Sequence, residues 1–161
     1  MCIYLVEDVS DDNHILDILD LTLTPALPRL GHQLRCQMDA RLKEPVDLTR
    51  IICNVVMKFG PLKMLDRNYT LPDLLAIMGA GLSGDPKPPA GPWKQTWYLQ
   101  IPETVPVAEH RIRLRARTGH GKGFFALDIP VDFRRRNHPF ATNDTVSSRM
   151  IHSTRHAVRR W

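Results

Sequence analysis

The chain contains four arginines that alternate with apolar residues, at Arg111, Arg113, Arg115 and Arg117. A two-residue period is typical of a strand with one buried and one exposed face. In such a strand all four guanidinium groups point to the same side within roughly 20 Å, at about 3.3 Å per residue. Because like charges repel at this spacing, the face must either bind a polyanion or be neutralised by acidic side chains.

Charge is unevenly distributed along the chain, although the net charge of the 161 residues is only +5. Residues 1–28 contain six acidic residues and no lysine or arginine, whereas residues 111–161 contain twelve basic and three acidic residues. Such asymmetry predicts a polyanionic partner for the C-terminal third. The candidate polyanion-binding residues are Arg111, Arg113, Arg115, Arg117, Lys122, Arg134, Arg135, Arg136, Arg155, Arg159 and Arg160.

Neutralisation by acids within the chain is the alternative interpretation of the arginine strand. Only Glu109, Asp128 and Asp132 lie near it in sequence, so polyanion binding is favoured. Few aromatic residues interleave with the arginines, which argues against base stacking. We therefore expect salt-sensitive, sequence-independent binding to phosphates of nucleic acid or anionic lipid, or to the acidic head of a neighbouring copy.

Length and hydrophobic patterning predict one α+β domain. We expect an acidic N-terminal arm over residues 1–30, which includes a short helix over 10–21, and a globular core over 31–161. Residues 33–42 alternate as a half-buried strand. Helices are predicted over 47–59, capped by Asp47, and over 71–82, capped by Thr70. Strands are predicted over 93–101, 111–117 and 124–129, the last two antiparallel, and a basic helix over 147–161.

The order of these elements resembles that of rhabdovirus matrix proteins, most closely the lyssavirus type. The resemblance covers about residues 34–101. It rests on an alternating strand, an amphipathic helix that ends in Lys58-Phe59, and a second apolar helix. That helix leads into Gly-Leu-Ser-Gly-Asp-Pro-Lys-Pro at 81–88 and an aromatic strand that begins Trp-Lys-Gln-Thr-Trp-Tyr at 93–98.

The resemblance implies a non-enzymatic virion protein that lies between nucleocapsid and envelope. Such proteins self-associate, condense the nucleocapsid, contact the anionic inner leaflet and the glycoprotein tail, and down-regulate viral RNA synthesis. The implied fold is a twisted antiparallel sheet packed with two to three helices, and the flexible arm of one copy docks on the next. The residues implied in self-association are Ile15, Leu16, Leu19, Pro25, Leu27, Pro28, Pro86, Pro88, Pro89 and Trp93.

The chain departs from the family in two places. Its N-terminal arm has Thr-Pro-Ala-Leu-Pro at 24–28 in place of a Pro-Pro-x-Tyr budding motif, and this arm is acidic where other members are rich in lysine. The resemblance then implies a plant-infecting member whose membrane contact lies in the basic third. Such a protein is expected in host cytoplasm and at membranes, and Arg134–Arg136 also fits a nuclear import signal.

No acid, base and nucleophile combine into a catalytic pattern, so no enzymatic activity, metal or cofactor is predicted. The Gly-x-Gly-x-x-Gly match at 79–84 follows an apolar helix and precedes prolines, which favours helix termination over dinucleotide binding. His152 and His156 lack the glutamate of a metalloprotease motif. The alternative function is a sequence-independent nucleic-acid-binding regulator of RNA synthesis. Assembly that depends on residues 1–30 would distinguish the matrix function from this regulator.

Overall fold

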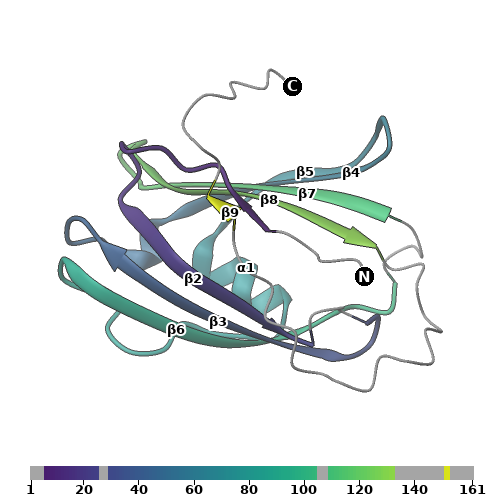
Figure 1. Ribbon diagram of the computed structural model, residues 1–161, viewed down its shortest axis with the longest axis horizontal. Coiled ribbons are helices and arrows are strands. Elements are labelled where there is room, and N and C mark those ends of the chain that lie inside the picture. The colour runs from purple at the N-terminus through teal and green to yellow at the C-terminus, as the bar shows by residue number, and fades with distance from the viewer. Residues whose placement is uncertain (1–5, 26–28, 105–108, 133–150, 153–161) are drawn as a thin grey trace.

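The computed structural model describes residues 6–25, 29–104, 109–132 and 151–152. In this part of the chain two β-sheets lie face to face, as Figure 1 shows. The arrangement is an immunoglobulin-like β-sandwich. The predicted α+β fold, with a flexible arm and a sheet packed by two to three helices, is therefore wrong.

The larger sheet has six strands, and β1 and β9 form its only parallel pair among the described residues. Its order is β5 (Leu62–Thr70), β4 (Ile52–Phe59), β7 (Glu109–Arg117), β8 (Gly123–Asp132), β1 (Glu7–Asp8) and β9 (Ile151–His152). The smaller sheet is fully antiparallel and has the order β2 (Leu16–Thr24), β3 (Gln33–Leu42) and β6 (Gly91–Gln100). The described helices are η1 (Leu48–Arg50) and α1 (Leu71–Ile77).

Strand β3 forms where its alternating pattern predicts it, over residues 33–42. Every second side chain from Leu34 to Leu42 is buried, and the intervening ones face outward. β6 pairs with β3 along its whole length and buries Trp93 and Gln95 on the same inner side. The predicted antiparallel pairing of β7 with β8 is also confirmed.

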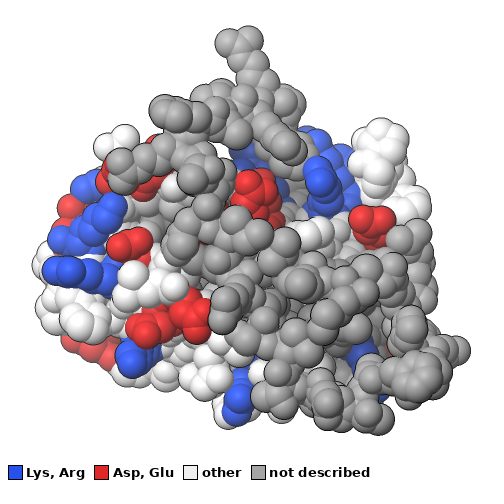
Figure 2. Space-filling view, in the orientation of Figure 1, with Lys and Arg blue, Asp and Glu red and all other residues white. Residues whose placement is uncertain are grey.

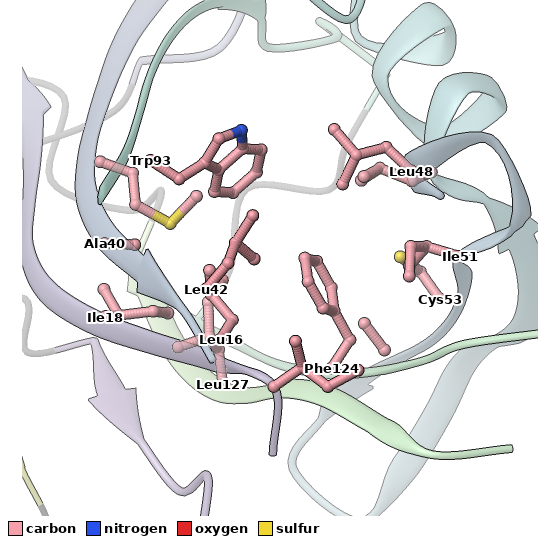
Figure 3. Packing of buried hydrophobic residues seen from close by; sticks show 14 of the residues in the cluster. Leu16, Ile18, Ala40, Leu42, Leu48, Ile51, Cys53, Trp93, Phe124 and Leu127 are labelled. Carbon is pink, nitrogen blue, oxygen red and sulfur yellow. The ribbon is translucent and has the colours of Figure 1, made fainter. Parts of the chain in front are cut away.

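The core lies between the two sheets (Figure 3). Phe124 of β8 is fully buried, and its ring contacts Trp93 of the facing sheet in an edge-on arrangement with centroids 6.3 Å apart. Buried side chains of β2, β3, β4 and η1 complete this cluster. This aromatic contact therefore packs one sheet against the other.

Residues 47–59 are not the predicted amphipathic helix. Asp47 does cap a helix, because its carboxylate accepts a hydrogen bond from the Thr49 amide, but this helix is the single 3₁₀ turn η1. Strand β4 follows, in which Val55 and Val56 are both buried although they point to opposite faces. Burial on both faces removes the alternation that reveals a strand, and the β-branched residues favour extended structure.

The predicted helix over 10–21 and the predicted arm are also replaced by strands. Residues 16–24 form β2, whose pairing with β3 shifts register between Ile18 and Asp20. This irregularity places Leu16, Ile18 and Leu21 in the core, a spacing that resembles a helical stripe. Residues 16–24, which were predicted as part of an arm, therefore form an edge strand of the smaller sheet.

Helix α1 is confirmed, but it is shorter than predicted. The Thr70 side chain accepts a hydrogen bond from the Asp73 amide, as the capping pattern predicts. The helix ends at Ile77, and Gly79 follows in the left-handed conformation with φ of 74°. This glycine stop agrees with the non-nucleotide interpretation of the glycine motif. Figure 1 shows α1 between the two layers.

The C-terminal helix predicted over 147–161 is wrong at residues 151 and 152, which form strand β9 beside β1. The rest of that predicted helix lies outside the described residues. Within the described ranges, no helix has the length and apolar character needed to span a membrane.

Candidate binding site at the hairpin end of the sandwich

The four arginines of β7 lie on the outer face of the six-stranded sheet, as their alternation predicts. The intervening residues point into the sandwich, where His110 and Ala116 are buried. Cross-strand pairing adds two lysines to this outer face, because Arg111 pairs with Lys58 of β4 and Lys58 pairs with Lys63 of β5. We call these six cationic side chains the basic face: Lys58, Lys63, Arg111, Arg113, Arg115 and Arg117.

Acidic side chains neutralise two of the six cations of the basic face, Arg115 and Lys63. Arg115 donates to Asp128 of β8 over 3.0 Å and also donates to the Leu127 carbonyl. Asp66 of β5 receives a hydrogen bond from the Lys63 ammonium over 3.0 Å. That bond and one from the Asn54 amide hold the pKa of Asp66 below its ordinary value. The neutralising interpretation thus applies in part, through Asp128, which lies near the arginines in sequence, and Asp66, which is distant from them.

Three cationic side chains are neighbours at one end of the basic face. Lys63, Lys58 and Arg111 lie side by side on three neighbouring strands, and the next residue across, on β8, is Pro130. Cross-strand like charges destabilise a sheet unless acidic groups approach them. The Lys63 ammonium is paired with Asp66 over 3.0 Å. One row further along, the buried Nε of Arg113 has no hydrogen-bond partner.

The same end carries exposed apolar side chains on the β4–β5 hairpin. Phe59 and Leu62 pair across the hairpin on the inner side of the sheet, and their exposed fractions are 47% and 57%. Met64 is the extra residue at a bulge beside them and is 46% exposed. Apolar side chains this exposed usually mark a binding surface when they occur together.

The exposed residues adjoin the interior of the sandwich through His110. The Phe59 ring contacts the ring of His110, which is 1% exposed, at a centroid distance of 6.1 Å. His110 pairs with Val131, which belongs to a small second cluster with Leu34 and Ile101. We call this cluster, together with Phe59, Leu62 and Met64, the hairpin end. The buried ring of His110 therefore lies between the exposed apolar residues and the second cluster.

Trp97 supplies a buried polar atom on the inner face of the other sheet. Its indole Nε1 is buried and has no hydrogen-bond partner. The neighbouring residue on that face, Leu99, packs against both apolar clusters. An unpaired buried donor costs about 1–3 kcal/mol, which a ligand with an acceptor atom would recover.

The other predicted polyanion-binding residues are placed apart from this end or are not described. Lys122 lies in the glycine-rich β7–β8 turn and forms an ion pair of 2.7 Å with Glu44. Lys122 therefore lies at the far end of β7 from Arg111. The remaining predicted residues, Arg134, Arg135, Arg136, Arg155, Arg159 and Arg160, lie outside the described residues.

The residues implied in self-association do not form one surface. Ile15, Leu16 and Trp93 are buried in the core, so they are unavailable to a partner in this fold. Pro88 is also buried, whereas Leu19 is 56% exposed on β2. Pro86 and Pro89 are exposed in the loop before β6, and Pro25 follows β2. Leu27 and Pro28 lie outside the described residues.

No constellation for catalysis or metal binding appears among the described residues. No group of three His, Cys, Asp or Glu side chains is close enough there to hold a metal ion. Burial raises the pKa of the Cys36 and Cys53 thiols to about 12, so neither is an activated nucleophile. A surface hollow of about 430 Å³ lies near Asp17 and Arg41, at the opposite end of β3 from Leu34.

Sequence reasoning missed Lys58, Lys63, Phe59 and Leu62 as a group. The predicted helix over 47–59 separated Lys58 from the arginine strand, so their pairing was hidden. The one available signal was the Gly60-Pro61 dipeptide between two apolar residues, which is a turn signal as well as a helix stop.

Comparisons with known proteins extend to the fold alone. No family model and no curated protein matches the chain. Among solved structures, a Niemann-Pick type C2 protein from Japanese carpenter ant is similar, with a TM-score of 0.56 and 10% identity over 79% of this chain and 97% of that one. The C-terminal domain of wzt has a TM-score of 0.47 and 11% identity over 74% and 73%.

Proposed function

We propose that this chain is a non-enzymatic lipid-binding domain that holds one amphipathic anion at the hairpin end. The observation that carries the proposal is the contact of the half-exposed Phe59 ring with the buried His110 ring, whose cross-strand neighbour Val131 belongs to the second cluster. The apolar chain of the ligand enters between the sheets there. Its acidic headgroup stays at the strand ends, within reach of Lys58 and Arg111.

Burial of apolar surface drives this binding, at about 25 cal/mol for each Å² removed from water. The ligand covers Phe59 and Leu62, which solvent otherwise contacts. Cations at the same end add electrostatic attraction that weakens with salt. Trp97 lies on the inner face of the other sheet, so it can report entry of the apolar chain between the sheets.

Quenching of tryptophan fluorescence by a brominated fatty acid tests this function on the full chain. Bromine quenches a tryptophan only at close range, so bromostearate reports entry between the sheets. We expect saturable quenching at one ligand per chain, greatly reduced in Trp97→Phe. Unbrominated stearate is the matched control and should compete without quenching. Absence of saturable quenching in the wild-type protein would overturn the proposal.

Binding of a nucleic-acid polyanion across the basic face is the second candidate function. It is favoured by the six cations on that face and by the unpaired Nε of Arg113. Fluorescence anisotropy with single-stranded RNA tests it, and the affinity should fall steeply as salt is raised. Equal RNA affinity for wild type and an Arg111→Glu/Arg117→Glu variant would exclude this candidate.

The role of a matrix protein stays a prediction from the sequence, with itself, the nucleocapsid, the inner leaflet and the glycoprotein tail as its partners. One element on which the resemblance rested, the helix that ends at Lys58-Phe59, is strand β4 in this fold. The part of that prediction which we retain in the proposal is contact with anionic lipid. Virion, cytoplasmic and nuclear locations likewise stay predictions.

A further inference from the structure

We propose that the tip of the β4–β5 hairpin, residues 59–64, docks this domain on the surface of an anionic lipid bilayer, with Leu62 and Met64 inserted among the headgroups. The inference rests on the proposed lipid-binding function and names the source of the ligand. It assigns to the tip a second task, which is contact with the bilayer from which a lipid is taken or to which it is delivered.

The tip is the most exposed apolar part of the six-stranded sheet. Phe59, Leu62 and Met64 are three of the six large hydrophobic residues that are strongly exposed in the described part of the chain. Figure 1 shows the hairpin projecting past the rest of the sheet at the upper right. A projecting tip can reach a flat surface without a clash from the rest of the sandwich. This shape suits a bilayer better than it suits a groove on another protein.

Lys63, Lys58 and Arg111 place three cationic side chains beside the tip, of which Lys63 also pairs with Asp66. In Figure 2, uncharged atoms at the place of the hairpin tip lie next to a group of Lys and Arg side chains. Aliphatic side chains flanked by cations are typical of segments that lie at the interface of anionic membranes. Nucleic acid would be recognised by cations with stacked aromatic rings, and Phe59 is the single aromatic residue at the tip.

The turn at the tip suits shallow insertion. Gly60 adopts φ of 55° and has nothing within 4 Å of the position that a Cβ would occupy. Pro61 follows it and has no backbone N–H that would need a partner in the headgroup region. Few backbone donors are therefore exposed where the hairpin meets lipid.

Co-sedimentation of the full chain with liposomes tests the inference. One set of liposomes contains phosphatidylcholine alone, and a second set contains phosphatidylcholine with phosphatidylserine. We expect binding to the second set that exceeds binding to the first. The Leu62→Asp/Met64→Asp variant should lose about tenfold or more in partition coefficient, because charges replace inserted apolar groups. Lys63→Glu should weaken binding about fivefold or more.

Leu19→Asp is the matched control, because Leu19 is exposed to 56% on the other sheet and Leu62 to 57%. It should bind liposomes as the wild type does. Equal losses in Leu19→Asp and the tip variant, or no loss in the tip variant, would overturn the inference. The inference would also be overturned if RNA displaced the wild-type protein and the tip variant from liposomes to the same extent.

Bromostearate quenching separates this inference from the function on which it rests. The tip variant should still show saturable quenching at one ligand per chain, with a weaker affinity because Leu62 lies at the entrance, since the second cluster that takes the apolar chain is unchanged. If the tip variant kept its quenching and bound liposomes as strongly as the wild-type protein does, membrane docking alone would be refuted. Loss of quenching in the wild-type protein would refute the lipid-binding function itself.

Discussion

The arginines of β7 share a face, but their surroundings differ from residue to residue. Arg115 is partly buried and donates both to the Asp128 carboxylate and to the Leu127 carbonyl. Arg117 is exposed at the end of the strand, where its cross-strand neighbours are Ile52 and Gly123. Regular spacing in the sequence therefore conceals two partly buried arginines, Arg113 and Arg115, between the exposed Arg111 and Arg117.

Replacement of Arg115 by alanine should cost about 1–3 kcal/mol of unfolding free energy, because a partly buried carboxylate loses its charged donor. Urea denaturation followed by circular dichroism measures this change. Arg117→Ala is the control, and it should stay within about 0.5 kcal/mol of wild type. Equal effects of the two substitutions would show that the ion pair with Asp128 contributes nothing to stability.

The two buried cysteines make stability depend on alkaline pH. Burial raises the pKa of Cys36 and Cys53 from 9.0 to about 12, so the folded protein keeps both thiols protonated. The unfolded chain ionises them above about pH 9, and unfolding free energy should therefore fall between pH 9 and 12. Urea titrations at several pH values measure the slope. The slope should flatten in Cys36→Ala/Cys53→Ala; an unchanged slope would assign the effect to other groups.

At the scale of the elements, prediction succeeded where one local pattern dominated. β3 alternates without interruption, and the Thr70 cap with Pro72 in the first turn defines the start of α1. Prediction failed at β4, which is buried on both faces, and at β2, where the register shift gives helix-like spacing. The polar edge strand β5 shows no apolar period, and it went unpredicted. These strands are specified by their neighbours in the sheet, which no local window contains.

Some residues of the candidate site were likewise predictable from the local sequence, and others were not. The four arginines were predictable, since they lie on one strand with a clear period. Lys58 and Lys63 join them only through pairing across three strands, and Phe59 meets His110 only through the same pairing. No spacing in the sequence reports such contacts.

The N-terminal cap of α1 offers a test at the scale of one element. Thr70→Ala removes the acceptor for the Asp73 amide and should cost about 1 kcal/mol of unfolding free energy. Thr70→Ser keeps the acceptor and should restore most of that stability. Thermal unfolding of both variants beside wild type provides the measurement. If serine and alanine were equally destabilising, the cost would come from the lost methyl group and not from the cap.

At the scale of the molecule, the two layers of the described residues share one main core, in which aromatic side chains from both sheets meet. Phe124 is fully buried and packs on Trp93 of the opposite sheet and on Phe125. Interior residues from both sheets surround it (Figure 3). We therefore expect the sandwich to unfold as a single cooperative unit.

Phe124→Ala should lower the unfolding free energy by about 3–5 kcal/mol, because it leaves a cavity between the sheets. Tryptophan fluorescence and far-ultraviolet circular dichroism should report the same transition midpoint in the wild-type protein. Tyr98→Ala is the control, since Tyr98 is 52% exposed on the outer side of the smaller sheet. Separate midpoints for the two probes would contradict the single core.

The central claim is that the hairpin end of this sandwich holds one amphipathic anion. Native mass spectrometry of the full chain after incubation with phosphatidylserine-containing liposomes tests it most directly. The account predicts a complex of one chain with one anionic lipid, which is lost when Val131→Trp fills the second cluster and is retained in Leu19→Asp. A spectrum that contains only the free chain, or lipid adducts equally abundant in Val131→Trp, would contradict the account.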